Sequence, residues 1–296
     1  MDFFSTTLAK VCLYFIVFII FIQLLSSCMQ MRTTPQKFQE NFAASSYQPT
    51  FQTYEADGRK MNYVEIGDTS LPTIIFIHGA PGSLDAFEKY LQDEDLLQKA
   101  HLISVDRAGY GYSDFGKSEV SIEKQAALLQ PILEKKKQNK PLVLVGHSYG
   151  GPVSARLSMD FPDLVDAMIL LAPALSPEDE RVFWVSYPAD FFLIKWLLPK
   201  PIRVSNDEKL AHAEELRKML PFWKNINIPT TIMQGDKDWI VPPANADFAE
   251  KMIAKKYLNL IRIDSASHFV PWTQFDLVKK LILEQIEEFE EDGKKQ

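Results

Sequence analysis

A short apolar run that ends in a glycine-flanked serine organises this chain, and it reads Leu142-Val143-Leu144-Val145-Gly146-His147-Ser148-Tyr149-Gly150-Gly151. The apolar part has the length of a buried strand, and the residues that follow have helical spacing. A serine on so tight a strand-to-helix turn needs neighbours without side chains two residues away, and Gly146 and Gly150 meet that requirement. The pattern predicts a nucleophilic Ser148 raised above a sheet, where the following helix N-terminus favours negative charge.

A serine nucleophile needs a base, and the base needs an orienting acid. His268 follows the expected strand Leu258–Ile263, and Asp238 follows the expected strand Thr230–Met233. The carboxyl ends of parallel strands lie at one edge of a sheet, so we expect Asp238 and His268 at the edge that carries Ser148.

Strands and helices alternate along the chain from residue 51 onward, and this alternation predicts an α/β fold with a mostly parallel, doubly wound sheet. Phe51–Tyr54 and Met61–Ile66 should form an antiparallel hairpin at one edge of that sheet. The other expected strands are Thr73–Ile77, His101–Val105, Pro141–Val145, Ala167–Leu171, Thr230–Met233 and Leu258–Ile263. The expected helices are Leu84–Lys99, Ser121–Gln138, Pro152–Phe161, Ala244–Ala254 and Gln274–Phe289.

The connection from Ala172 to Pro229 is far longer than the roughly twelve residues that one helical crossover needs. It is rich in aromatic side chains, namely Phe183, Trp184, Tyr187, Phe191, Phe192, Trp196, Phe222 and Trp223. We expect residues 174–227 to form a helical cap after strand six, with these side chains packed on each other or over a cavity. A helical insertion with its own small core is the alternative.

Four motifs, in this order, resemble the α/β-hydrolase superfamily from about residue 51 to residue 290. Besides the serine turn they are His78-Gly79-Ala80-Pro81-Gly82 (oxyanion loop), Asp106-Arg107-Ala108-Gly109-Tyr110-Gly111-Tyr112-Ser113 (loop after strand four) and Gly235-Asp236-Lys237-Asp238-Trp239-Ile240-Val241-Pro242 (acid loop). The resemblance implies an α/β-hydrolase fold and a catalytic triad of Ser148, Asp238 and His268. It also implies an oxyanion hole made by the backbone N–H groups of Ala80 and Tyr149.

Several other polar residues near the motifs have alternative interpretations. Asp236 is the alternative acid, although the matched loop favours Asp238. We expect His78 and His147 to support the oxyanion loop and the serine turn, and Asp106 and Arg107 to stabilise loops. For Arg107, contact with a substrate carboxylate is the alternative. The serine nucleophile excludes the dehalogenases and epoxide hydrolases of this fold, which use aspartate, and departures at Ala80 and Tyr149 argue against proline iminopeptidase activity.

Hydrophobic residues are crowded at the front of the chain, where Val11–Leu25 has fourteen of them in fifteen positions, interrupted by Gln23. As a helix this run would span ~22 Å, short of the ~30 Å hydrocarbon core of a bilayer. Leu25-Ser26-Ser27-Cys28 resembles a bacterial lipoprotein signal, which implies cleavage before Cys28 and lipidation of its thiol. We therefore expect a signal peptide or anchor at 1–27, a polar tether at 28–50 and a hydrolase domain at 51–290. An uncleaved anchor and simple secretion are the alternatives.

Composition excludes several classes of function. The formal net charge is -7, from 32 basic and 39 acidic residues, which argues against nucleic-acid binding. Two cysteines and five histidines without metal-ligand spacing predict no disulfide framework, no metal and no cofactor.

The sequence thus predicts a serine carboxylesterase that hydrolyses small or medium acyl esters through an acyl-enzyme. It should be held at a membrane of the bacterial cell envelope, with its catalytic domain outside the cytoplasm. An amidase, an aminopeptidase and a carbon–carbon bond hydrolase share the same triad and remain alternatives. A non-catalytic ligand-binding relative is the alternative of another class, and the oligomeric state is not predicted.

Overall fold

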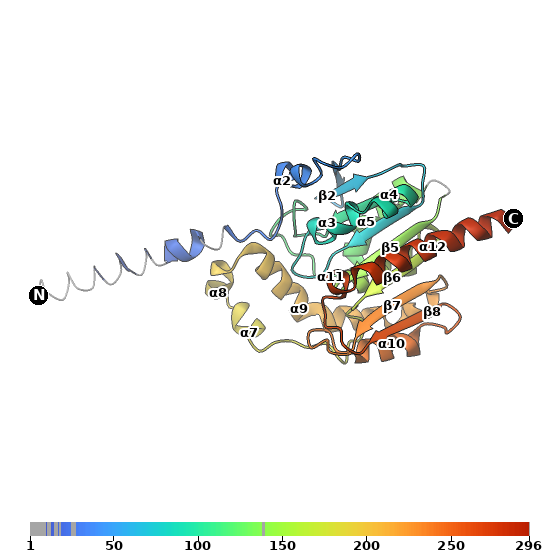
Figure 1. Ribbon diagram of the computed structural model, residues 1–296. Helices are drawn as coiled ribbons and strands as arrows, with labels where there is room; N and C mark the ends of the chain where they lie inside the picture. Colours follow the sequence, from blue (N-terminus) through green and yellow to red (C-terminus); the bar gives the residue numbers. More distant parts are fainter. Residues whose placement is uncertain are drawn as a thin grey trace, which may run out of the picture.

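The computed structural model describes residues 10, 13, 14, 17, 19–24, 28–137 and 140–295, with side chains up to residue 291. An eight-stranded sheet runs through the molecule in the order β1-β2-β4-β3-β5-β6-β7-β8 (Figure 1). Its strands are β1 (Thr50–Ala56), β2 (Arg59–Ile66), β3 (Thr73–Ile77), β4 (His101–Asp106), β5 (Leu142–His147), β6 (Ala167–Leu171), β7 (Thr230–Gly235) and β8 (Leu258–Ile263). β2 pairs antiparallel with both β1 and β4, and the remaining pairs are parallel. The predicted fold class and the hairpin at the sheet edge are confirmed.

Helices connect these strands and lie in the chain order expected for a doubly wound sheet. They are α2 (Pro35–Asn41), α3 (Glu88–Leu91), α4 (Glu94–Lys99), α5 (Ile122–Lys137), α6 (Gly150–Asp160), α7 (Ser186–Ala189), α8 (Phe192–Leu197), α9 (Lys200–Met219), α10 (Ala244–Met252), α11 (Val270–Thr273) and α12 (Phe275–Lys295). The short 3-10 turns are η1 (Leu84–Phe87), η2 (Pro162–Leu164) and η3 (Leu220–Asn225).

The single helix predicted over Leu84–Lys99 is wrong, because the structure divides this segment into η1, α3 and α4. The break has a local cause. The Asp93 side chain accepts a hydrogen bond from the Leu96 backbone N–H at 3.1 Å and so caps the start of α4. An aspartate in the N-cap position competes with helix continuation through its extended backbone, which the apolar periodicity does not reveal.

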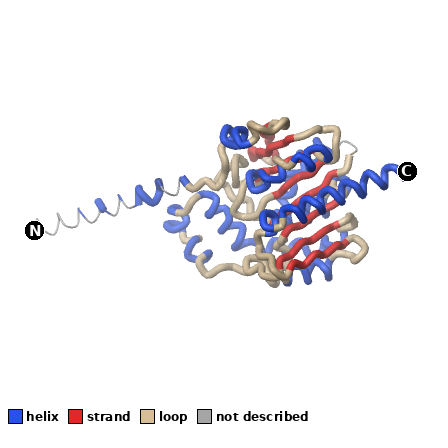
Figure 2. The backbone as a smooth tube through the Cα atoms, in the orientation of Figure 1, coloured by secondary structure: helices blue, strands red, loops and turns tan. Residues whose placement is uncertain are grey.

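Helices cover both faces of the sheet and produce two cores (Figure 2). β5 shows how the strands divide between them, because Leu142 and Leu144 belong to one core while Val143 and Val145 belong to the other. The first core includes side chains of α5, α6 and α10, and the second includes side chains of α2, α3, α4 and α12. Packing on both faces fixes the position of the carboxyl end of each strand, and a site built at that edge of the sheet requires this.

The segment before the sheet is polar but partly packed. Phe38 on α2 and Phe42 just after it are buried and stacked, with ring centroids 5.2 Å apart. Most of the predicted signal or anchor at 1–27 lies outside the described residues, whereas Cys28 is described and exposed. Within the described part of the chain, the structure contains no helix with the length and apolarity to cross a bilayer.

The long connection between β6 and β7 forms α7, α8, α9 and η3. Trp223 is buried in the first core, and Phe183 contributes to the wall of a cavity. The expectation that the aromatic residues of this segment pack on each other or cover a cavity is wrong for three of them, while Phe191 and Phe192 contact each other but stay exposed. The five that stay largely exposed are Trp184, Tyr187, Phe191, Phe192 and Trp196. They lie on or beside α7 and α8, which are only four and six residues long and too short to form a core of their own.

Candidate active site

Ser148 lies on a sharp turn between β5 and α6, with a positive φ of 54°. The two glycines around it are required by packing. A Cβ on Gly146 would lie 2.5 Å from Ser154 Oγ, and a Cβ on Gly150 would lie 2.1 Å from the Ile77 carbonyl oxygen. Both distances are too short for any side chain, so the close approach of backbone at this turn is what holds Ser148 in its strained conformation.

Asp238 and His268 form a buried acid–base pair. The Nδ1–H of His268 donates to Asp238 Oδ2 at 2.7 Å. The other carboxylate oxygen, Oδ1, accepts the backbone N–H groups of Ile240 at 2.9 Å and Val241 at 2.8 Å. Because Nδ1 carries the proton, Nε2 of His268 is the ring nitrogen that can accept one.

Asp236, the alternative acid, lies elsewhere on the same loop. Its side chain is 34% exposed and its Oδ1 is 3.5 Å from Arg262 Nη1. The Asp238 side chain, in contrast, is fully buried against His268. Two residues separate these carboxylates in sequence, and the structure pairs only the second with the histidine.

His268 is held beside the serine turn through His147, the residue that precedes Ser148. The Nε2–H of His147 donates to the His268 carbonyl oxygen at 3.1 Å, and the two ring centroids are 4.8 Å apart. Burial, followed by the charge of His268, lowers the pKa of His147 to about 3, so this ring is neutral at pH 7. Within the described part of the chain, Ser148 Oγ makes no hydrogen bond. In sites of this kind the serine–histidine contact often tightens only when substrate binds.

The predicted oxyanion hole consists of the backbone N–H groups of Ala80 and Tyr149. Ala80 and Tyr149 line one cavity together with Ser148. Among the residues that the structure describes, none accepts a hydrogen bond from the backbone N–H of Ala80 or of Tyr149. Tyr149 immediately precedes α6, and its N–H belongs to the unpaired donors at a helix start. The two donors can therefore bind an oxyanion.

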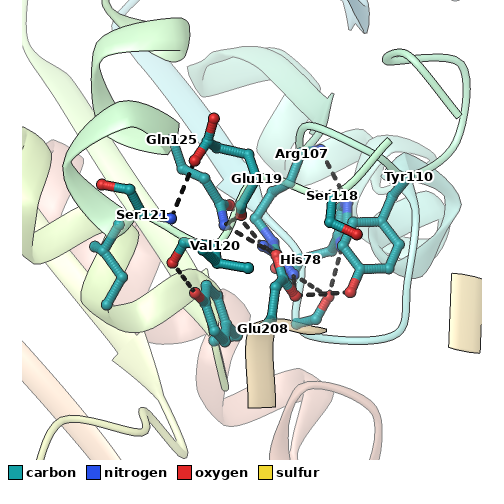
Figure 3. A network of polar contacts seen from close by, with 12 residues as sticks. His78, Arg107, Tyr110, Ser118, Glu119, Val120, Ser121, Gln125 and Glu208 are labelled. Atoms are coloured by element: carbon teal, nitrogen blue, oxygen red, sulfur yellow. Dashed lines mark hydrogen bonds and ion pairs between the residues drawn. The ribbon is translucent and has the colours of Figure 1, made fainter. Parts of the chain in front are cut away.

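The oxyanion loop is fixed by a buried network around His78 (Figure 3). His78 Nδ1–H donates to the Gly79 carbonyl at 2.7 Å, while His78 Nε2 accepts the backbone N–H of Arg107 at 3.0 Å. Burial and the charge of Arg107 lower the pKa of His78 well below its usual value, which keeps the ring neutral. The Arg107 guanidinium also donates from Nε to the His78 carbonyl at 2.9 Å. His78 therefore supports the loop, as the sequence indicates.

Arg107 also ties the loop to the insertion. Its Nη1 donates to Glu208 Oε1 on α9 at 2.6 Å and to Gln125 Oε1 at 2.6 Å. The Tyr110 hydroxyl donates a hydrogen bond to Glu208 Oε2 at 2.7 Å, and this contact belongs to the network in Figure 3. The Arg107 and Glu208 side chains are fully buried. The alternative that Arg107 binds a substrate carboxylate is therefore wrong, because this guanidinium is already paired and has no access to substrate.

The cavity in front of Ser148 has a volume of about 250 Å³. The insertion contributes polar side chains to its wall that the sequence analysis missed, namely Glu180, Ser205, Asn206, Lys209 and His212. His212 pairs its Nδ1 with Glu180 Oε2 at 3.1 Å and stacks on Tyr149 with ring centroids 4.5 Å apart. Positions 205, 209 and 212 are spaced by four and three residues, so they share one face of α9, and this spacing was the available signal.

No cluster of three or more His, Cys, Asp or Glu side chains with the arrangement of a metal site occurs within the described residues. The site thus combines a serine on the cavity wall, an imidazole that Asp238 orients beside the serine turn, and two residues with backbone donors on the same wall. These are the groups that acyl transfer requires.

The fold and these groups define a class of protein. Over residues 72–193 the chain matches the family described as alpha/beta hydrolase fold. The chain has the α/β-hydrolase fold, and this match supports a hydrolytic enzyme.

Relatives of this chain include two bacterial lipases. It is 26% identical over 251 residues to Lipase 1 of Psychrobacter immobilis, covering 72% of this chain and 76% of that lipase. It is 25% identical over 236 residues to Lipase 3 of Moraxella sp., covering 67% of this chain and 72% of that lipase. Among solved structures, a membrane phospholipase A described as a bacterial virulence factor superposes with a TM-score of 0.62 at 16% identity. That superposition covers 97% of this chain and 99% of the phospholipase, and it shows a shared fold.

Proposed function

We propose that this hydrolase is a serine esterase of the lipase type, which cleaves acyl esters through an acyl-enzyme. The observation that carries the proposal is the buried Asp238–His268 pair, held by His147 beside the strained turn of Ser148. The unpaired N–H groups of Ala80 and Tyr149 on the same cavity support it, as does the similarity to two lipases.

The proposed reaction uses each group once per half-cycle. Ser148 Oγ attacks the ester carbonyl while His268 Nε2 takes the hydroxyl proton, and Asp238 stabilises the resulting imidazolium. The N–H groups of Ala80 and Tyr149 bind the oxyanion. His268 then protonates the departing alkoxide, which leaves an acyl-Ser148. Water, deprotonated by His268, attacks this ester, and collapse of the second oxyanion releases the acid and returns the proton to Ser148.

The cavity indicates the size and polarity of the substrate. Its volume of about 250 Å³ is near the lower end of pockets for small organic ligands, ~300 Å³. Phe183, Ile202 and Val241 supply apolar wall, and Lys209 and His212 supply polar wall. A small or medium acyl chain against the apolar side and an oxygen-rich leaving group against the polar side fit this division.

We further propose that the chain is held at a membrane of the bacterial cell envelope, with its catalytic domain outside the cytoplasm. The apolar run Val11–Leu25 and the residues before Cys28 support this proposal, and the exposure of Cys28 is compatible with lipidation. Metabolic labelling with a palmitate analogue tests it. Label should appear on the wild type and be lost in Cys28→Ala, whereas membrane association without label would favour an uncleaved anchor.

A fluorophosphonate probe tests the catalytic proposal. The full chain should be labelled, and Ser148→Ala should abolish labelling because the nucleophile is gone. Ser158→Ala is a matched control, since Ser158 is buried on α6, the helix that follows Ser148, and its hydroxyl donates to the Ala155 carbonyl. An unlabelled wild type would contradict the esterase assignment, and label retained in Ser148→Ala would contradict the choice of nucleophile. A series of p-nitrophenyl esters of increasing chain length then defines the acyl preference.

A further inference from the structure

A patch of apolar side chains covers the outer surface of α7 and α8. We call it the cap patch, and each member is between 53% and 79% exposed: Trp184, Tyr187, Phe191, Phe192, Leu193 and Trp196. All six lie within thirteen residues, on or directly before two short helices that contact each other. Soluble monomers rarely expose contiguous apolar surface of this kind unless something covers it.

The cap patch lies next to the apolar segment at the front of the chain. The side-chain amide of Gln23 donates from Nε2 to the Trp196 carbonyl at 2.7 Å. Figure 1 shows the described helical residues 19–24 beside α8, on the same side of the molecule. Gln23 is two residues from the end of the apolar run Val11–Leu25. If that run enters a bilayer, α8 lies close to the membrane surface. If the chain is instead cleaved before Cys28, the contact of Gln23 is lost, and the lipid on Cys28 holds the chain at the membrane.

Residues at this junction have the chemistry of a bilayer interface. Two tryptophans and a tyrosine occur in the cap patch, and such rings favour the headgroup level because one end is apolar and the other polar. Arg32, Lys200 and Arg203 line a second cavity together with Gln23. The Nε of Arg203 is buried and has no hydrogen-bond partner within the described chain. Cationic side chains beside a membrane segment attract the phosphates of anionic lipids.

The cap patch is also continuous with the catalytic cavity. Phe183 and Ser186 line that cavity, whereas their neighbours Trp184 and Tyr187 face outward. The same short segment therefore has one side on the catalytic cavity and the other side on the exposed surface. A lipid layer against the outer side would place the cavity wall within a few residues of ester-bearing lipids.

We propose that the cap patch docks on the lipid bilayer interface beside the N-terminal segment and presents the catalytic cavity to lipid esters. The presentation of the cavity to lipid esters rests on the proposed esterase function, whereas docking on the bilayer does not, because docking needs no turnover. Lipid is the occupant that the structure favours over a second copy of the chain, because the patch is continuous with a segment of membrane-like composition.

Tryptophan quenching by brominated phosphatidylcholine tests the docking directly. The full chain is reconstituted in vesicles that contain this lipid and an anionic lipid. Wild-type emission should be quenched, and Trp184→Phe combined with Trp196→Phe should remove most of the quenched component. Trp223→Phe is the control, because Trp223 is buried in the core and should make no difference to quenching. Equal fractional quenching in the double variant and the wild type would overturn the proposal.

Kinetics on two substrates test the consequence of docking. Tyr187→Glu combined with Phe192→Glu places charges in the cap patch, outside the residues that line the catalytic cavity. Hydrolysis of a vesicle-borne ester should fall about tenfold, because charged groups are costly at the lipid interface, while hydrolysis of soluble p-nitrophenyl butyrate stays unchanged. Leu220→Glu is the control, since Leu220 is also an exposed apolar residue but follows the end of α9 that is farther from α8.

The two proposals fail in different ways. A wild type that hydrolyses neither ester contradicts the esterase assignment, and the quenching measurement still decides docking. Vesicle hydrolysis that is unaffected by the two glutamates overturns docking as the route to substrate. A dimer in detergent that the same glutamates dissociate, without any change in lipid quenching, would assign the cap patch to a second copy and overturn the proposal.

Discussion

The sheet edge and the insertion between β6 and β7 build the same cavity by different physical means. Ser148, Asp238 and His268 follow β5, β7 and β8, and tight turns hold each of them within a few residues of its strand. The insertion has no such support. α9 is joined to the loops at the sheet edge by the buried ion pair Arg107–Glu208 and packs Leu216 and Met219 into the first core, whereas α7 and α8 keep their apolar side chains exposed. The triad thus depends on rigid, local geometry, whereas the outer part of the insertion, α7 and α8, is largely exposed.

The largest effect on activity should come from the sheet edge, where two neighbouring carboxylates, Asp236 and Asp238, should differ in their effect on kcat. Asp238→Asn should lower kcat by about 10⁴-fold, because an amide at this position favours the wrong tautomer of His268. Asp236→Asn should change kcat by less than about twofold, because Asp236 pairs with Arg262 on the surface, where ion pairs contribute little. Steady-state kinetics on a soluble ester measures both. Equal losses in the two variants would contradict the assignment of the acid.

The next effect concerns the attachment of α9. Glu208→Ala should lower the free energy of unfolding by ~3–5 kcal/mol, because it leaves the buried guanidinium of Arg107 without its partner. Glu214→Ala, an exposed carboxylate on the same helix, should stay within ~0.5 kcal/mol of the wild type. Urea unfolding of the full chain in detergent measures the difference. If both variants match the wild type, the ion pair is not what fastens the insertion.

A smaller effect should appear in the pH dependence of stability through His147. The folded pKa of about 3 is below the value of ~6.5 expected in the unfolded chain, so the unfolded state binds more protons between these values. The stability from this group is therefore present above pH 6.5 and is lost as pH falls toward 3, with a slope of up to ~1.4 kcal/mol per pH unit. His147→Gln should flatten the unfolding free energy against pH between 6.5 and 5. An unchanged slope would show that His147 is not buried neutral.

The smallest effect should come from α7 and α8, which sharpens the contrast with α9. Trp184→Ser should leave the free energy of unfolding within ~0.5 kcal/mol, because an exposed side chain loses little on truncation. Trp223→Ser should cost ~3–5 kcal/mol, since this indole is buried in the first core. Thermal and urea unfolding compare the pair. A large loss in Trp184→Ser would mean that the cap patch is part of a core.

The predictability of the site follows the same division. Strand positions and the residues Ser148, Asp238 and His268 could be placed from the sequence, because short continuous apolar runs and glycine-rich turns are local signals. The choice of Asp238 over Asp236 needed a family resemblance, and the structure supplies its reason, since only Asp238 reaches the imidazole. The break at Asp93 and the polar wall from Lys209 and His212 escaped prediction, because a capping side chain and a shared helix face compete with stronger apolar periodicity.

Local chemistry in the chain is enough to define an α/β sheet, a serine turn and an acid and a base at the ends of later strands. Tertiary structure alone decided how Arg107 is used, since its partner Glu208 lies far along the chain, and no local pattern links the two. It also decided which aromatic residues of the insertion are buried and which form the cap patch. Composition records that Trp184 and Trp223 are both apolar, but burial is a property of what packs against each side chain. That depends on contacts between distant segments rather than on neighbours in sequence.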